Sequence, residues 1–196
     1  TTFQNAEDMS DYTQKAELYE ECIAVPEQGG NIAAYLGLIR AYRDNDHVFT
    51  DEEAGRLEKL ISNHRDALQK KPGDYAELCY EMGKLYWYYY QSNTNKVTSA
   101  IYAKTWFDKV IEYAPEDYVN RGTAEVYSAV GDFYSLITEL QKTGGDKGVY
   151  ADFFHNLSAL MDTVGKNENE TEIVRLEMLE LARSAIQQYT TKFKRD

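Results

Sequence analysis

Hydrophobic residues recur along this chain at intervals of three and four positions, with charged residues between them. This spacing places apolar side chains on one face of an α-helix, whereas a strand requires strict alternation. Alternating stretches are scarce, and the run from Leu85 to Tyr90 has helical periodicity on both sides. The pattern predicts an all-α protein of about eight helices, near residues 6–24, 31–45, 51–71, 74–92, 97–114, 118–142, 147–165 and 170–194.

The sequence also predicts where several helices begin and end. Capping residues that precede a glutamate by three positions predict three helix starts, at Thr50 with Glu53, Asp74 with Glu77, and Asn169 with Glu172. Each proline follows a helical stretch, and the three are 46 and 43 residues apart, at Pro26, Pro72 and Pro115. We interpret them as stops between helical hairpins.

The last predicted helix carries a continuous apolar stripe. Its members recur every three or four residues and share one face, namely Ile173, Leu176, Leu179, Ala182, Ile186, Tyr189 and Phe193. The pattern predicts that this stripe packs against the rest of the protein. Residues 147–196 would then form a capping helix pair, whose outer face must be polar to end a stack of helices.

Hairpins of about 40 residues suggest an internal repeat. One pattern occurs three times: an aromatic or apolar residue, then an apolar residue followed by Gly, then a Tyr. Its members are Tyr35, Leu38 and Tyr42 in the first copy, Met82, Gly83 and Tyr86 in the second, and Tyr127, Val130, Gly131 and Tyr134 in the third. Ile39 and Cys79 depart from that pattern. A second-helix pattern follows at Ala103, Phe107, Val110 and Pro115. The arrangement resembles the tetratricopeptide repeat, which implies a single domain over residues 1–196, built as a right-handed superhelix of antiparallel helix pairs.

Three phrases carry a narrower resemblance: AYLGLIRAY, YAELCYEMGKLYWYYY and KTWFDKVIEYAPE. They resemble the tetratricopeptide-like, non-catalytic segment that follows the catalytic domain in some bacterial membrane-anchored serine/threonine protein kinases. The resemblance implies a sensor or interaction segment on the extracellular face of a bacterial plasma membrane. A free-standing cytoplasmic scaffold is the alternative.

The charge balance narrows the range of partners. The chain has 33 acidic and 21 basic residues, for a net charge of −12. Nucleic acids and anionic membranes attract basic surfaces, so we expect neither as a partner. No run reaches the ~18 apolar residues that span a bilayer, so membrane contact would require a segment outside this chain. The two cysteines, Cys22 and Cys79, lie in apolar helical contexts and are predicted to be reduced core thiols.

The sequence offers little support for catalysis. His64, Arg65 and Asp66 spell the kinase catalytic-loop tripeptide, but they lie inside a predicted helix, and Lys71 stands where a metal-binding Asn is required. The three histidines match no metal motif, and neither do the acids between Asp44 and Glu53. We therefore expect no enzyme activity, no metal and no cofactor, although a helical-bundle enzyme whose site assembles on folding is an alternative.

A small basic and aromatic patch is the candidate ligand site. If the chain folds as tetratricopeptide repeats, one face of the first helix of each repeat lines an inner concave surface. The residues on that face are Arg40, Arg43, Tyr80, Lys84, Trp87 and Tyr88. Aromatic and Arg side chains concentrate interface energy. We therefore predict a protein or peptide ligand, with an acidic or carboxylate-bearing group for the cations. A glycan, cell-wall fragment or other small molecule is the alternative.

The run from Trp87 to Tyr90 has two interpretations. An aromatic stripe at helical spacing is usually core, in which case Trp87 and Tyr88 pack between repeats. Four successive aromatics nevertheless cover roughly 300° of a helix. At least one of the four rings is therefore expected to face solvent or a groove.

Overall fold

The computed structural model describes residues 1–44, 48–90, 96–143, 146–165 and 171–193. These residues form ten α-helices and one short 3-10 helix. The described ranges contain no strand, only an isolated bridge between Phe49 and Tyr90. The all-α prediction is confirmed, with more helices than expected because two predicted helices are each divided in two.

The first of these divisions lies near the N-terminus. The helix predicted over 6–24 is two helices, α1 (Thr2–Asp8) and α2 (Tyr12–Ala24), followed by η1 (Pro26–Gln28) and α3 (Ile32–Asp44). Met9 is extended, and the Asp11 side chain accepts a hydrogen bond from the Gln14 amide at 3.0 Å. Asp11 therefore caps a new helix, since a capping carboxylate satisfies a backbone donor that has no partner within its own helix.

The second division lies at His64. The helix predicted over 51–71 becomes α4 (Asp51–Asn63) and α5 (Arg65–Gln69), because His64 leaves helical geometry. The start of α4 is as predicted: Thr50 and Glu53 form a reciprocal capping box. Each side chain bonds the backbone amide of the other residue, at 3.2 and 3.0 Å.

The remaining helices follow the predicted ranges closely. They are α6 (Pro72–Tyr89), α7 (Lys96–Tyr113), α8 (Arg121–Thr143), α9 (Lys147–Gly165) and α10 (Thr171–Lys192). The predicted cap at Asp74 is wrong, because α6 already begins at Pro72 with Lys71 before it. Proline suits the first turn of a helix, where its missing N–H is not needed. The predicted cap at Asn169 lies outside the described residues.

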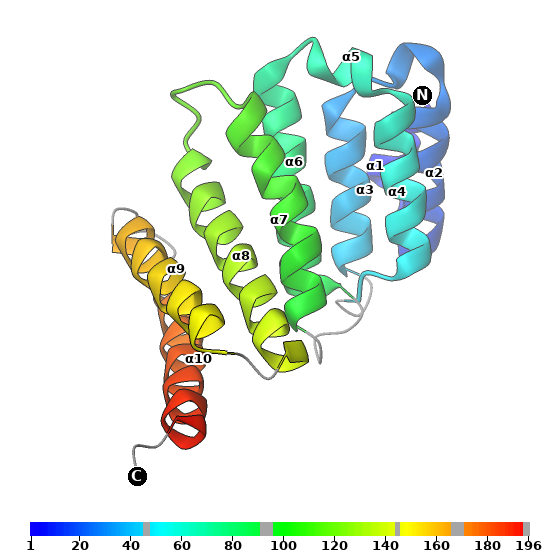
Figure 1. Ribbon diagram of the computed structural model, residues 1–196. Helices are drawn as coiled ribbons and strands as arrows, with labels where there is room; N and C mark the ends of the chain where they lie inside the picture. The colour runs from blue at the N-terminus through cyan, green and yellow to red at the C-terminus, as the bar shows by residue number, and fades with distance from the viewer. Residues whose placement is uncertain (45–47, 91–95, 144–145, 166–170, 194–196) are drawn as a thin grey trace.

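Helices α3, α6, α7 and α8 stand side by side in a curved row (Figure 1). Helices α1, α2 and α4 lie at the N-terminal end of this row, and α9 and α10 lie at the other end. The tightest packing joins α6 to α7 and α7 to α8. Each helix therefore packs mainly on its neighbours in the row.

Several glycines, among them Gly83 and Gly37, allow helices to approach closely. A Cβ at Gly83 would lie 2.7 Å from the Phe107 ring, and a Cβ at Gly37 would lie 2.3 Å from the Tyr19 ring. Both distances are shorter than carbon atoms tolerate, so only glycine permits these contacts between α6 and α7 and between α2 and α3. Gly83 is one of the repeat positions, whereas Gly37 stands two residues before the expected position, which Ile39 occupies.

Tyrosine hydroxyls donate to carboxylates on other helices at six places between residues 7 and 118. The rings of Tyr19, Tyr42 and Tyr86 are buried. A buried phenol needs a hydrogen-bond partner. The tyrosine–acid pairs are Tyr12 with Glu53, Tyr19 with Glu7, Tyr42 with Glu20, Tyr86 with Glu58, Tyr90 with Asp51, and Tyr118 with Glu77. Much of the tyrosine excess, and part of the acidic excess, is therefore structural.

The apolar stripe of α10 is only partly covered. Tyr189 and Phe193 pack against Tyr150 of α9, with ring centroids 5.3 and 5.8 Å apart. Leu176, Leu179 and Ile186 are 63%, 56% and 52% exposed, so the prediction of one packed stripe is wrong at these three positions. Within the described ranges, no helix combines the length and apolar content needed to cross a membrane. Cys22 and Cys79 are buried free thiols, as predicted.

Candidate functional site

A cleft of about 220 Å³ opens between α3 and α6. Residues one helical turn apart share a face and line its two walls. The wall from α3 is Ile39 and Arg43, and the wall from α6 is Glu81, Lys84, Leu85, Tyr88 and Tyr89. The cleft therefore has an apolar floor with two cations, one carboxylate and two phenols around it.

Three of the six predicted site residues meet in this cleft. Arg43, Lys84 and Tyr88 all line it. Arg40 does not: its guanidinium lies 3.8 Å from the Glu7 carboxylate of α1, because Arg40 stands on a different side of α3. The α1–α2 break, which periodicity did not predict, brings Glu7 to this position.

Tyr80 and Trp87 are core residues, so their assignment to an open groove is wrong. Tyr80 is 3% exposed and packs edge-on against Phe107 and Tyr118, with centroids 5.9 and 6.4 Å away. Trp87 is 2% exposed and packs edge-on against Tyr127 at 4.8 Å. The Tyr80 ring thus contacts α7 through Phe107, and the Trp87 ring contacts α8 through Tyr127.

The four rings from Trp87 to Tyr90 point in different directions, as a helix requires. Trp87 enters the core toward α8, and Tyr90 is buried beside Phe49. Tyr89 is half-buried in the cleft. Tyr88 is 39% exposed, and its hydroxyl hydrogen-bonds that of Tyr127. The prediction that at least one ring faces solvent or a groove is confirmed.

The cations of the cleft are held by weak ion pairs. The Lys84 ammonium lies 3.6 Å from Glu81, and the Arg43 guanidinium lies 3.4 Å from Asp44. Both side chains are more than one third exposed, and exposed pairs contribute about 0–1 kcal/mol. Such pairs exchange readily for an incoming carboxylate, which Arg43 can bind through two parallel hydrogen bonds.

The sequence reasoning missed four residues that line the cleft. Ile39, Glu81, Leu85 and Tyr89 were not assigned to the site. Glu81 and Leu85 stand one turn from Lys84 and Tyr88, so helical spacing could have found them. The sequence pattern indicates for Ile39 only that it stands where the repeat expects a glycine.

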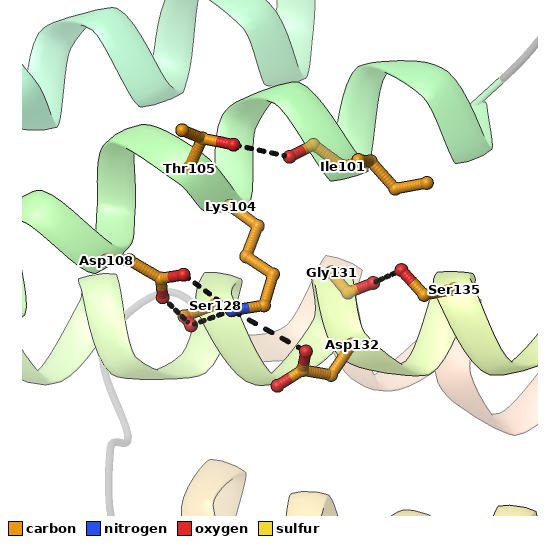
Figure 2. A network of polar contacts seen from close by, with 8 residues as sticks. All are labelled: Ile101, Lys104, Thr105, Asp108, Ser128, Gly131, Asp132 and Ser135. Atoms are coloured by element: carbon orange, nitrogen blue, oxygen red, sulfur yellow. Dashed lines mark hydrogen bonds and ion pairs between the residues drawn. The ribbon is translucent and has the colours of Figure 1, made fainter.

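Lys104 anchors a polar network between α7 and α8 (Figure 2). Its ammonium donates to Asp108 at 2.6 Å and to Ser128 at 3.4 Å, and lies 3.5 Å from Asp132. Partial burial alone would lower the pKa of Lys104, but the carboxylates of Asp108 and Asp132 raise it above its ordinary value. A protonated lysine cannot act as a general base toward the serine. The network therefore ties the two helices together.

Within the described ranges, no group of three or more His, Cys, Asp or Glu side chains could hold a metal ion. Searches for similar proteins by family, among curated proteins and among solved structures found no match. The geometry of the cleft is therefore the evidence on function.

Proposed function

We propose that this protein is a non-catalytic binding module that holds an acidic peptide or protein segment in the α3–α6 cleft. The observation that carries the proposal is the meeting of Arg43, Lys84 and Tyr88 around an apolar floor. Arginine and tyrosine provide directional contacts with large area. The surrounding protein is strongly acidic, with a net charge of −12, so two adjacent cations stand out as an attachment point.

A peptide suits the cleft better than an enclosed small molecule. Lys84 and Arg43 are 37% and 36% exposed in their side chains, and Tyr88 is 39% exposed. These walls are open to solvent, whereas small-molecule sites bury most of their ligand. An open cleft accepts one or two side chains of a longer segment.

The tetratricopeptide resemblance is part of the proposal. Repeat positions Gly83 and Phe107 make the close contact between α6 and α7, and Tyr127 stacks on Phe107 at 4.8 Å. These contacts support a repeat in which α6 and α7 pack through the repeat glycine. The proposed placement within a bacterial serine/threonine kinase rests on the three sequence phrases.

The test is a titration of the protein with blocked peptides rich in Asp and Glu, with their amide counterparts, and with soluble cell-wall fragments. We expect the acidic peptides to bind and the amide peptides to bind weakly. Lys84→Gln and Arg43→Gln should each weaken binding about fivefold, which corresponds to roughly 1 kcal/mol. Lys70→Gln is the matched control, because Lys70 is exposed at the end of α5 and lies outside the cleft.

Binding that is unchanged in both cleft variants would overturn the proposal, provided that circular dichroism shows them folded. Preferential binding of cell-wall fragments would also overturn it and favour a glycan sensor. Since Arg43 and Lys84 are partly exposed, neither substitution is expected to unfold the protein.

A further inference from the structure

A second groove runs between α4 and α7, across the other side of α6. Tyr75 and Tyr86 line it from α6, roughly 150° around that helix from Glu81 and Lys84 at 3.6 residues per turn, and Tyr90 lines it just after the helix ends. The groove consists of two hollows of about 450 and 460 Å³. They share the residues at their junction, Gly55, Glu58, Thr105 and Trp106.

The junction is open because Gly55 has no side chain. No atom lies within 4 Å of the position that a Cβ of Gly55 would occupy. Leu57 and Ile61 of α4 are both buried, and Ile61 also lines the second hollow. The two hollows are therefore continuous along the length of α4.

Three tyrosine rings surround one end of the groove. The centroids of Tyr86, Tyr90 and Tyr102 lie 5.4 to 5.6 Å from one another, so the rings form a compact cluster. Tyr102 is 45% exposed and forms the outer edge. Aromatic faces carry a negative electrostatic potential that attracts ammonium and guanidinium groups.

The same end is rich in hydrogen-bond acceptors. The Tyr86 hydroxyl donates to Glu58 at 2.6 Å, and the Tyr90 hydroxyl donates to Asp51. The Glu58 carboxylate can accept further hydrogen bonds, because an ionised carboxylate accepts about four. Among the described residues that line this end, none is a lysine or an arginine. The end thus combines two negative charges with aromatic faces, which is the complement of a cationic side chain.

The opposite end carries the opposite charge. Lys59, Arg65 and Lys109 line the second hollow, and the Lys109 ammonium lies 4.3 Å from the centroid of the Trp106 ring. From Gly55 to Ser62 the groove follows seven residues of α4, which is roughly 11 Å at 1.5 Å per residue. An extended peptide covers that distance in about three or four residues.

We propose that this groove binds an extended peptide segment whose Lys or Arg side chain enters the tyrosine end. An acidic residue three or four positions away meets Lys59, Arg65 and Lys109. The opposite charges of the two ends fix the direction of the peptide. The site is distinct from the α3–α6 cleft and does not depend on the function proposed for it.

The test is isothermal titration of the full chain with a blocked peptide of about ten residues. The peptide carries Lys and Asp about four positions apart in a Gly/Ser background. Two companion peptides replace Lys by norleucine or Asp by Asn. We expect the norleucine peptide to bind about tenfold more weakly, because it loses the cation–π and ionic contacts. Binding should also weaken between about 50 and 500 mM salt, as screening increases.

Protein variants localise the interaction. Glu58→Gln removes a charge but keeps an oxygen that accepts from Tyr86, and Tyr102→Leu removes a half-exposed ring, so both are expected to fold. Each should weaken binding of the Lys peptide about fivefold or more. Glu112→Gln is the matched control, because Glu112 is exposed on α7 outside the groove.

Absence of binding to the Lys peptide, or equal binding of the norleucine peptide, would overturn the proposal. So would unchanged affinity in both Glu58→Gln and Tyr102→Leu. The cleft is tested with purely acidic peptides and with Arg43 and Lys84 variants, so failure of either site is recognised independently of the other.

Discussion

At the scale of single residues, the recurring device is a buried tyrosine that donates to an acid on another helix. Tyr19 donates to Glu7, and Tyr42 donates to Glu20, which also accepts from Arg56 at 3.2 Å. The ring fills the space between helices, and the hydroxyl satisfies a carboxylate at the edge of the core. These tyrosine–acid hydrogen bonds together explain, in part, why the chain is rich in both tyrosine and acidic residues.

This device makes the stability of the protein sensitive to alkaline pH. Burial and the hydrogen bond to Glu7 raise the pKa of Tyr19 to about 12, and burial raises that of Tyr75 to about 12. In the unfolded chain these groups titrate near 10. Their contribution is therefore fully present below about pH 10 and is lost as pH rises from there through about 12.

We expect the urea midpoint of unfolding to be constant at neutral pH and to fall steadily above about pH 10. Tyr19→Phe should reduce this fall, since it removes one of the shifted groups. A midpoint that does not change up to about pH 12 would contradict the role assigned to the tyrosine hydroxyls.

At the scale of helices, glycine positions decide how closely the elements pack. Phe107 of α7 lies over Gly83 of α6, and its other face stacks on Tyr127 of α8 at 4.8 Å with an interplanar angle of 12°. The ring is held from both sides and has little room to move. The α6–α7–α8 packing therefore depends on the missing side chain.

Gly83→Ala should destabilise the protein by about 1–3 kcal/mol, because the added methyl overpacks this contact. Gly73→Ala is the matched control in the same helix, with no atom within 4 Å of the added carbon. It should leave stability unchanged or raise it by up to about 1 kcal/mol. Thermal unfolding of the two variants provides the comparison, and equal melting temperatures would contradict the close-packing argument.

At the scale of the whole molecule, packing is uneven along the row of helices. Helices α6, α7 and α8 pack most closely and bury Trp87, Phe107 and Tyr127, whereas α10 exposes Leu176, Leu179 and Ile186 by 63%, 56% and 52%. Local opening costs least where few apolar contacts must be broken. The C-terminal helix pair is therefore the least stable part of the described fold.

Amide hydrogen exchange followed by mass spectrometry should show this gradient. We expect the slowest exchange in α6 and α7 and the fastest helical exchange in α10. Protection in α10 equal to that in α6 would mean that its exposed apolar side chains are covered in solution. The size of the protein, measured by light scattering, would then identify self-association as the cause.

The sequence alone determined the all-α class, the reduced cysteines and the ranges of most helices. These properties depend on local signals: a period of 3.6 residues, or the Thr50–Glu53 capping box. The sequence did not predict the helix breaks at Asp11 and His64. The spacing of apolar residues continues across both positions, whereas the backbone geometry interrupts the helix there.

Only the tertiary structure decided which side chains form the sites. Periodicity placed six residues on one patch, but the packing of α6 on α7 and α8 buries Tyr80 and Trp87, and α1 engages Arg40. The groove between α4 and α7 joins residues about fifty positions apart, such as Glu58 and Trp106. Helical spacing determines which side chains share a face. What each face meets depends on neighbours that only folding brings together.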